Sequence, residues 1–159
     1  MSGRRWVVPL ILTATSYTGF AVSLYLTFVH YRGYVSHCYV VEGCEQVQTS
    51  RFAVIFGVPV ALLGLIFFTA MFYLGIGVLT RSSVKLVRAY KVLAYLGALA
   101  AVPLFLVQAI ALRAYCTYCV LTEIILLVMW GVSFLLKAPA QASETAKVGA
   151  APRGKGKAA

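Results

Sequence analysis

Long apolar stretches separated by short charged segments dominate the chain. Four of them contain almost no charged residue, and they cover positions 6–29, 52–80, 92–112 and 114–136. Each is long enough to cross a hydrocarbon core of about 30 Å as a helix, which takes about 20 residues. Because the apolar runs are continuous and do not alternate with polar positions, they indicate helices and not barrel strands. The pattern predicts an all-α integral membrane protein, a four-transmembrane-helix bundle in which Pro59 kinks the second helix.

Composition supports the membrane class. Of the 159 residues, 62% are hydrophobic and 11% are charged, compared with about 45–50% and about 25% in an ordinary soluble domain. So apolar a chain is neither disordered nor a soluble monomer. We interpret the first stretch as an uncleaved helix, since it is longer than a signal-peptide core and lacks a clear cleavage site. Residues 1–137 form the predicted membrane domain, and 138–159, rich in Ala, Gly and Lys, a disordered basic cytoplasmic tail.

The net charge of +10 is distributed very unevenly about the predicted helices. Of the 14 Lys and Arg residues, only Arg32, Arg51 and Arg113 fall on the side of the first and third connections. By the positive-inside rule, both termini are cytoplasmic in a cell membrane and these connections are extracytoplasmic. Membrane topology thus accounts for the basicity, and no nucleic-acid partner is expected.

All four cysteines fall on this outer side. Cys38 and Cys44 lie in the first connection, and Cys116 and Cys119 open the fourth stretch as a C-x-x-C motif. The outer side is the oxidising one, where disulfides persist. Positions i and i+3 share a helix face, and a helix N-terminus stabilises a thiolate. We therefore interpret Cys116 and Cys119 as a redox-active pair and not as two small core residues.

The loop pair allows more than one interpretation. Cys38 and Cys44 form either a permanent disulfide that closes a short ring or a second thiol–disulfide exchange pair, which the neighbouring C-x-x-C favours. A four-cysteine zinc site is disfavoured, because this spacing is wider than that of zinc knuckles. Since the fourth helix enters the membrane, Cys119 lies about 4.5 Å deeper than Cys116. Exchange between the pairs requires Cys44 and Cys116 to meet.

Taken together, these motifs resemble the vitamin K epoxide reductase family, particularly its bacterial and archaeal members. The resemblance rests on the C-x5-C loop pair, Ser50 six residues later, the segment FAVIFGVP at 52–59, and the C-x-x-C at the fourth helix. It covers roughly residues 6–136. It implies a four-helix bundle around a quinone of the ubiquinone, menaquinone or vitamin K type. It also implies oxidation of a thioredoxin-like partner, with the electrons passed to the membrane quinone.

The resemblance further implies roles for individual residues. Cys116 and Cys119 match the family's active-site pair, Cys38 and Cys44 its shuttle pair, and Ser50 a Ser or Thr near the site. Many prokaryotic members carry a fused thioredoxin-like domain after the bundle, whereas a short polar tail follows here, so we expect a separate partner protein. Vertebrate members have a tyrosine at the position of Glu123, a difference that favours plain quinone reduction over epoxide reduction.

Three other polar residues are candidates for contact with the quinone. Gln108 either reaches a quinone oxygen or forms an interhelical hydrogen bond. Glu123 shares a helix face with Cys119 and either relays a proton or bonds a neighbouring helix as a buried acid. Arg51 either favours an anionic species at the site or anchors the chain at the interface.

Two other functions remain open from the sequence. A structural or adaptor protein with four membrane spans would hold its cysteines in permanent bonds and bind no quinone. A small transporter would show polar residues inside several helices, and here Glu123 and Gln108 are nearly alone.

The charge asymmetry yields a first prediction. Reduced Cys38 should react with a membrane-impermeant thiol reagent added to the outer face of intact cells, because the first connection is extracytoplasmic. Labelling that required opening of the inner face would contradict both the topology and the proposed oxidising environment.

Overall fold

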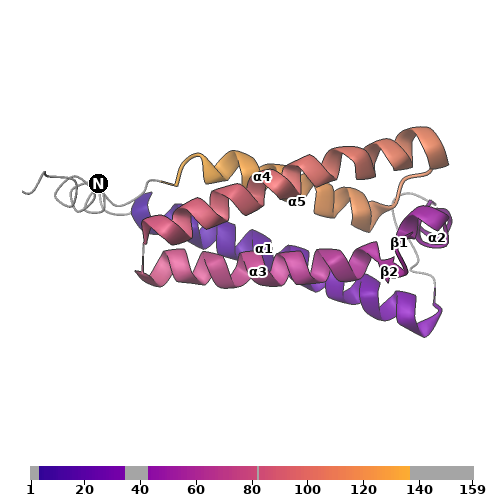
Figure 1. Ribbon diagram of the computed structural model, residues 1–159, viewed down its shortest axis with the longest axis horizontal. Helices are drawn as coiled ribbons and strands as arrows, with labels where there is room; N and C mark the ends of the chain where they lie inside the picture. Colours follow the sequence, from indigo (N-terminus) through magenta and orange to yellow (C-terminus); the bar gives the residue numbers. More distant parts are fainter. Residues whose placement is uncertain (1–3, 35–42, 82, 137–159) are drawn as a thin grey trace, which may run out of the picture.

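The computed structural model describes residues 4–34, 43–81 and 83–136, and this part of the chain is mostly helical (Figure 1). Cys38 and the predicted tail at 138–159 lie outside the described residues. In chain order the elements are α1 (Arg4–Arg32), α2 (Cys44–Gln48), the 3₁₀ turn η1 (Arg51–Ala53), β1 (Val54–Ile55), β2 (Val58–Pro59), α3 (Val60–Arg81), α4 (Val84–Leu106), the π-helix η2 (Val107–Leu112) and α5 (Thr117–Ser133).

Three of the helical segments are long and apolar enough to cross a membrane, namely Trp6–Arg32, Val60–Arg81 and Val84–Leu112. The expectation of a helical membrane protein is therefore met for three of the four apolar stretches. The fourth stretch forms α5, an apolar helix of 17 residues. Since a perpendicular span takes about 20 residues, a fourth crossing through α5 stays a prediction.

The second apolar stretch differs from the all-α prediction in its first eight residues. Val54 pairs antiparallel with Pro59, and Ile55 with Val58, in a short hairpin. Its turn residues Phe56 and Gly57 have φ values of 51° and 83°, the positive values that a type I′ turn requires.

Pro59 consequently lies in β2 and does not kink α3, so that prediction is wrong. A proline disfavours helical backbone at the residue before it, and α3 accordingly begins at Val60, directly after the proline.

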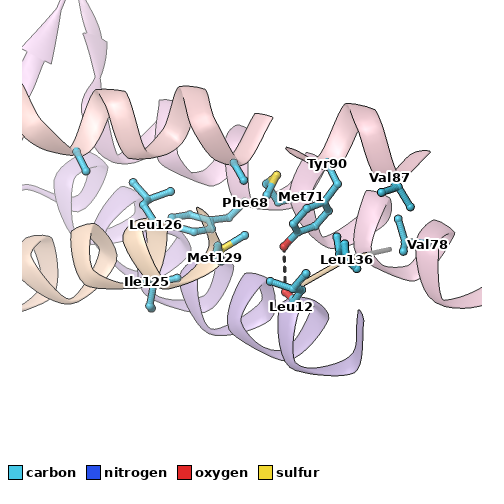
Figure 2. Packing of buried hydrophobic residues seen from close by; sticks show 12 residues of the cluster. Leu12, Phe68, Met71, Val78, Val87, Tyr90, Ile125, Leu126, Met129 and Leu136 are labelled. Atoms are coloured by element: carbon cyan, nitrogen blue, oxygen red, sulfur yellow. Dashed lines mark hydrogen bonds between the residues drawn. The ribbon is translucent and has the colours of Figure 1, made fainter. Parts of the chain in front are cut away.

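The helices are arranged in two pairs, α1 along α3 and α4 along α5 (Figure 1). At one end of the bundle, α2 and the hairpin lie beside the turn from η2 into α5 (Figure 1). Large side chains fill the other half, where Phe68, Met71 and Met129 are almost fully buried (Figure 2). There the Tyr90 hydroxyl donates a hydrogen bond of 3.4 Å to the carbonyl of Leu12. Side chains thus fill the space between the helices in the half of the bundle away from α2.

A second prediction concerns the contact of α1 with α3. A Cβ at Gly19 would overlap the ring of Phe68, which is 2% exposed. Gly19→Ala should lower the thermal unfolding temperature, because overpacking of a core typically costs about 1–3 kcal/mol. Gly131→Ala is the control, since nothing lies within 4 Å of that position and alanine favours a helix. Equal unfolding temperatures of the two variants in detergent would contradict the close packing.

Candidate functional site

The short helix α2 brings a loop cysteine to the start of α5. The Sγ atoms of Cys44 and Cys116 lie 3.5 Å apart, although the residues are 72 positions apart in the sequence. Both side chains are buried, with exposed fractions of 2% and 0%. Cys44 is disulfide-bonded, whereas Cys116 and Cys119 are free thiols. A free thiol in contact with a disulfide sulfur is the arrangement from which thiol–disulfide exchange proceeds.

Cys116 has an environment that favours a thiolate. It is the N-cap residue of α5, and its sulfur accepts a hydrogen bond of 3.4 Å from the backbone N–H of Cys119. The side-chain amide of Gln48 donates to the same sulfur at 3.9 Å. Donors and the positive end of the helix dipole both stabilise negative charge on sulfur.

The π-helix η2 positions a buried amide between Cys116 and Glu123. Oε1 of Gln108 accepts a hydrogen bond of 3.0 Å from the backbone N–H of Cys116. Its Nε2 donates a bond of 2.7 Å to Oε1 of Glu123. The carbonyl of Gln108 accepts from the N–H of Ala114 at 3.2 Å, next to Arg113 in left-handed conformation, and this closes η2. Segments of π-helix are rare and occur frequently at functional sites.

Glu123 keeps one oxygen available. Its side chain is 5% exposed, and within the described residues Oε2 has no hydrogen-bond partner. A buried polar atom without a partner is costly. A ligand oxygen near Oε2 would remove that cost.

These residues meet at a cavity of about 800 Å³ in the half of the bundle nearest α2 and the hairpin. Cys119 lines the cavity together with four candidate residues, Ser50, Arg51, Gln108 and Glu123. Cys116 is not part of this wall. Most of the remaining wall is apolar and includes Leu26, Leu63, Phe67, Leu96, Leu104 and Val107. The cavity thus combines an apolar lining with a few polar groups on one side, as small-molecule sites commonly do.

The candidates also have local partners. The Ser50 hydroxyl donates to the carbonyl of Val47 at 2.7 Å, and the Arg51 guanidinium lies 5.1 Å from the ring centroid of Phe52. Gln108 forms the interhelical hydrogen bond considered for it and also faces the cavity. Gln48 was missed by the sequence analysis, although it stands four residues after Cys44 and so shares its helix face.

Comparison with known proteins gives one finding about the whole chain. The model of the vitamin K epoxide reductase family matches residues 10–134, which include all four cysteines and all four cavity candidates. No curated protein matches the chain.

Proposed function

The chain belongs to the vitamin K epoxide reductase family, and on that premise we propose that it oxidises a separate thioredoxin-like partner and uses a membrane quinone as the electron acceptor. Membership and the apolar helices make it a membrane-embedded oxidoreductase. The finer proposal is carried by one observation, a continuous series of contacts from Cys44 through Cys116 to Cys119 at the cavity wall. The outcome is the formation of disulfide bonds in the partner.

In the proposed relay, each step is an exchange through a mixed disulfide. A partner thiolate attacks the loop disulfide, and the partner leaves oxidised while Cys38 and Cys44 become thiols. Cys44 then attacks Cys116 of an oxidised C-x-x-C pair, and Cys119 leaves as a thiolate. Cys38 resolves the new bond, so the loop disulfide forms again and two electrons rest on Cys116 and Cys119. A disulfide-bonded Cys44 beside two free thiols is the state expected after this transfer.

The cavity suits a quinone. Its volume lies within the range of about 300–1,000 Å³ that is typical of small-molecule sites, and its wall is mostly apolar. Polar atoms of Gln108, Glu123, Ser50 and Arg51 would hold the ring oxygens, whereas the apolar wall would hold the rest of the molecule. When bound, a quinone would accept two electrons and two protons. Any of the ubiquinone, menaquinone or vitamin K types satisfies these requirements.

Glu123 is the proposed proton carrier at the cavity. The side-chain amide of Gln108 donates to Oε1, so the proton of a neutral Glu123 resides on Oε2, the oxygen without a partner among the described residues. Glu123 follows Cys119 by four residues, which puts both side chains on one face of α5. A proton held on Oε2 is therefore close to the cysteine that faces the cavity.

A third prediction separates the two cysteine pairs by the reductant supplied. Cys38→Ala should lose oxidation of a thioredoxin-like protein but keep part of its dithiothreitol-driven quinone reduction, because a small dithiol reaches the C-x-x-C pair directly. Cys119→Ala should lose both activities, since it is the one cysteine of the described residues that lines the cavity. Both rates are measured on purified protein, with quinone reduction followed by absorbance.

Thermal unfolding of both variants is the control for folding. A permanent loop disulfide would instead make both activities fall together with stability, since a native disulfide is typically worth about 2–5 kcal/mol. Equal loss of both activities in a stably folded Cys38→Ala protein would contradict the shuttle. An adaptor protein would show no quinone reduction even in the wild type.

A fourth prediction tests the proton carrier. Glu123→Gln keeps an oxygen that accepts from Gln108 but removes the acidic proton. The rate of quinone reduction should fall by about a hundredfold, at the lower end of what a positioned general acid contributes. Exchange between Cys44 and Cys116 should continue, and its rate is the internal control. A variant with wild-type activity and unchanged pH dependence would show that Glu123 only bonds a neighbouring helix.

A further inference from the structure

The backbone of α2 comes very close to the backbone that precedes α5. Gly43 is the N-cap residue of α2, and a Cβ added to it would lie 2.6 Å from the carbonyl oxygen and 2.7 Å from the amide nitrogen of Tyr115. Non-bonded heavy atoms do not approach so closely. Because both atoms belong to the backbone, neither can rotate away. A side chain at this position would push the two segments apart.

Position 43 requires a glycine because a side chain would not fit there, and not because of its backbone conformation. Its φ of −98° is accessible to any residue. Gly33 and Gly57 differ, because they have φ values of 67° and 83°, and a Cβ added to either would meet nothing within 4 Å. Of these three glycines, Gly43 alone is explained by a close approach between two segments.

The consequence follows from adjacency in the sequence. Gly43 and Tyr115 directly precede Cys44 and Cys116, whose sulfur atoms are 3.5 Å apart. Forming the mixed disulfide requires the sulfurs to close to about 2.05 Å with the Cα atoms no more than about 6.8 Å apart. If Gly43 and Tyr115 were pushed apart, the distance between the Cys44 and Cys116 sulfurs would therefore increase by nearly the same amount.

The other contacts of α2 are more adjustable. The side chain of Gln46 donates to the carbonyl of Leu112 at 3.3 Å, and that of Gln48 donates to the Cys116 sulfur at 3.9 Å. Both are long side chains with several rotatable bonds, so they can follow a displacement. The two closest contacts at Gly43 cannot follow it, because they are formed by backbone atoms of Tyr115.

We propose that Gly43 is a positioning residue of the electron relay, whose missing side chain sets the distance at which Cys44 and Cys116 react. This inference rests on the proposed function. In the step that it controls, the Cys44 thiolate attacks the Cys116 sulfur, the Cys44–Cys116 bond forms, and the Cys116–Cys119 bond breaks. Cys119 takes up the electron pair as a thiolate.

The fifth prediction measures this contact directly in full-length protein. With Cys38→Ala and Cys119→Ser, Cys44 and Cys116 are the two cysteines left, and added diamide takes two electrons from this pair of thiols to join them in a disulfide that no third thiol can resolve. A Cys44–Cys116 bond should accumulate and be found by peptide mapping after acid quenching. Adding Gly43→Ala should reduce its rate of formation about tenfold, which corresponds to about 1.4 kcal/mol. Gly131→Ala, where nothing lies within 4 Å, should leave the rate unchanged.

Activity of the single variants with all cysteines present gives the second measurement. Gly43→Ala should oxidise a thioredoxin-like protein about tenfold more slowly than Gly131→Ala, while both retain dithiothreitol-driven quinone reduction. Wild-type rates for both activities and for bond formation would overturn the role of Gly43. Equal loss of both activities would also overturn it, because a general structural role produces that pattern. Failure of the wild type to reduce a quinone would instead refute the proposed function and leave the bond-formation measurement to decide on Gly43.

Discussion

The bridge formed by the Gln108 side chain is the interaction on which the geometry of the site depends. One end of the amide holds the backbone N–H of Cys116, and the other end holds a carboxyl oxygen of Glu123. It therefore fixes α5 against η2 at two points, the N-cap residue Cys116 and Glu123 in the second turn, and holds the start of the C-x-x-C pair in place. All three residues are buried, so their polar groups have no water to bind and depend on these hydrogen bonds instead. Cys44 and Gly43 pack against this same segment, at Cys116 and Tyr115.

The bundle has a filled half and, nearer α2 and the hairpin, a hollow half that contains the cavity. Met71, Tyr90 and Met129 occupy the space between the helices in the filled half, and Phe68 lies at its border with the cavity. On the cavity side the lining of α3 and α4 includes the small residues Gly64, Gly97 and Ala100, and the ring of Phe67 packs against Gly97, where a Cβ would lie 2.6 Å from it. Cys44, Cys116 and Cys119 lie at the end of the hollow half, where α2 and the hairpin meet the turn from η2 into α5 (Figure 1). A ligand can thus be enclosed without weakening the core that holds the helix pairs together.

Much of this arrangement could be predicted from the sequence, for identifiable reasons. Apolar length located the long helices, and the spacing of Cys116 and Cys119 located the start of α5, because both are local properties of the chain. The expectation that Cys44 meets Cys116 came from the requirements of exchange chemistry. The hairpin at 54–59 was missed because its residues are as apolar as the helix that follows. The π-helix was missed because the hydrophobic pattern of a helix hardly changes when one turn contains an extra residue. The hydrogen bond between Gln108 and Glu123, which are 15 positions apart, was not identified either, because it depends on the position of the π-helix.

Burial separates the two ends of the proposed relay. Cys116 is fully buried and is not part of the cavity wall, whereas Cys119 belongs to that wall. On its other side, Cys116 contacts Cys44 of the loop helix. A ligand in the cavity would therefore meet Cys119, whereas Cys116 would be reached from the side of Cys44. Cys116 is the one cysteine of the described residues that contacts both Cys44 and Cys119, so in the proposed relay the electrons would pass through it. The position of this one sulfur between Cys44 and Cys119 is what gives the proposed relay its order of transfer.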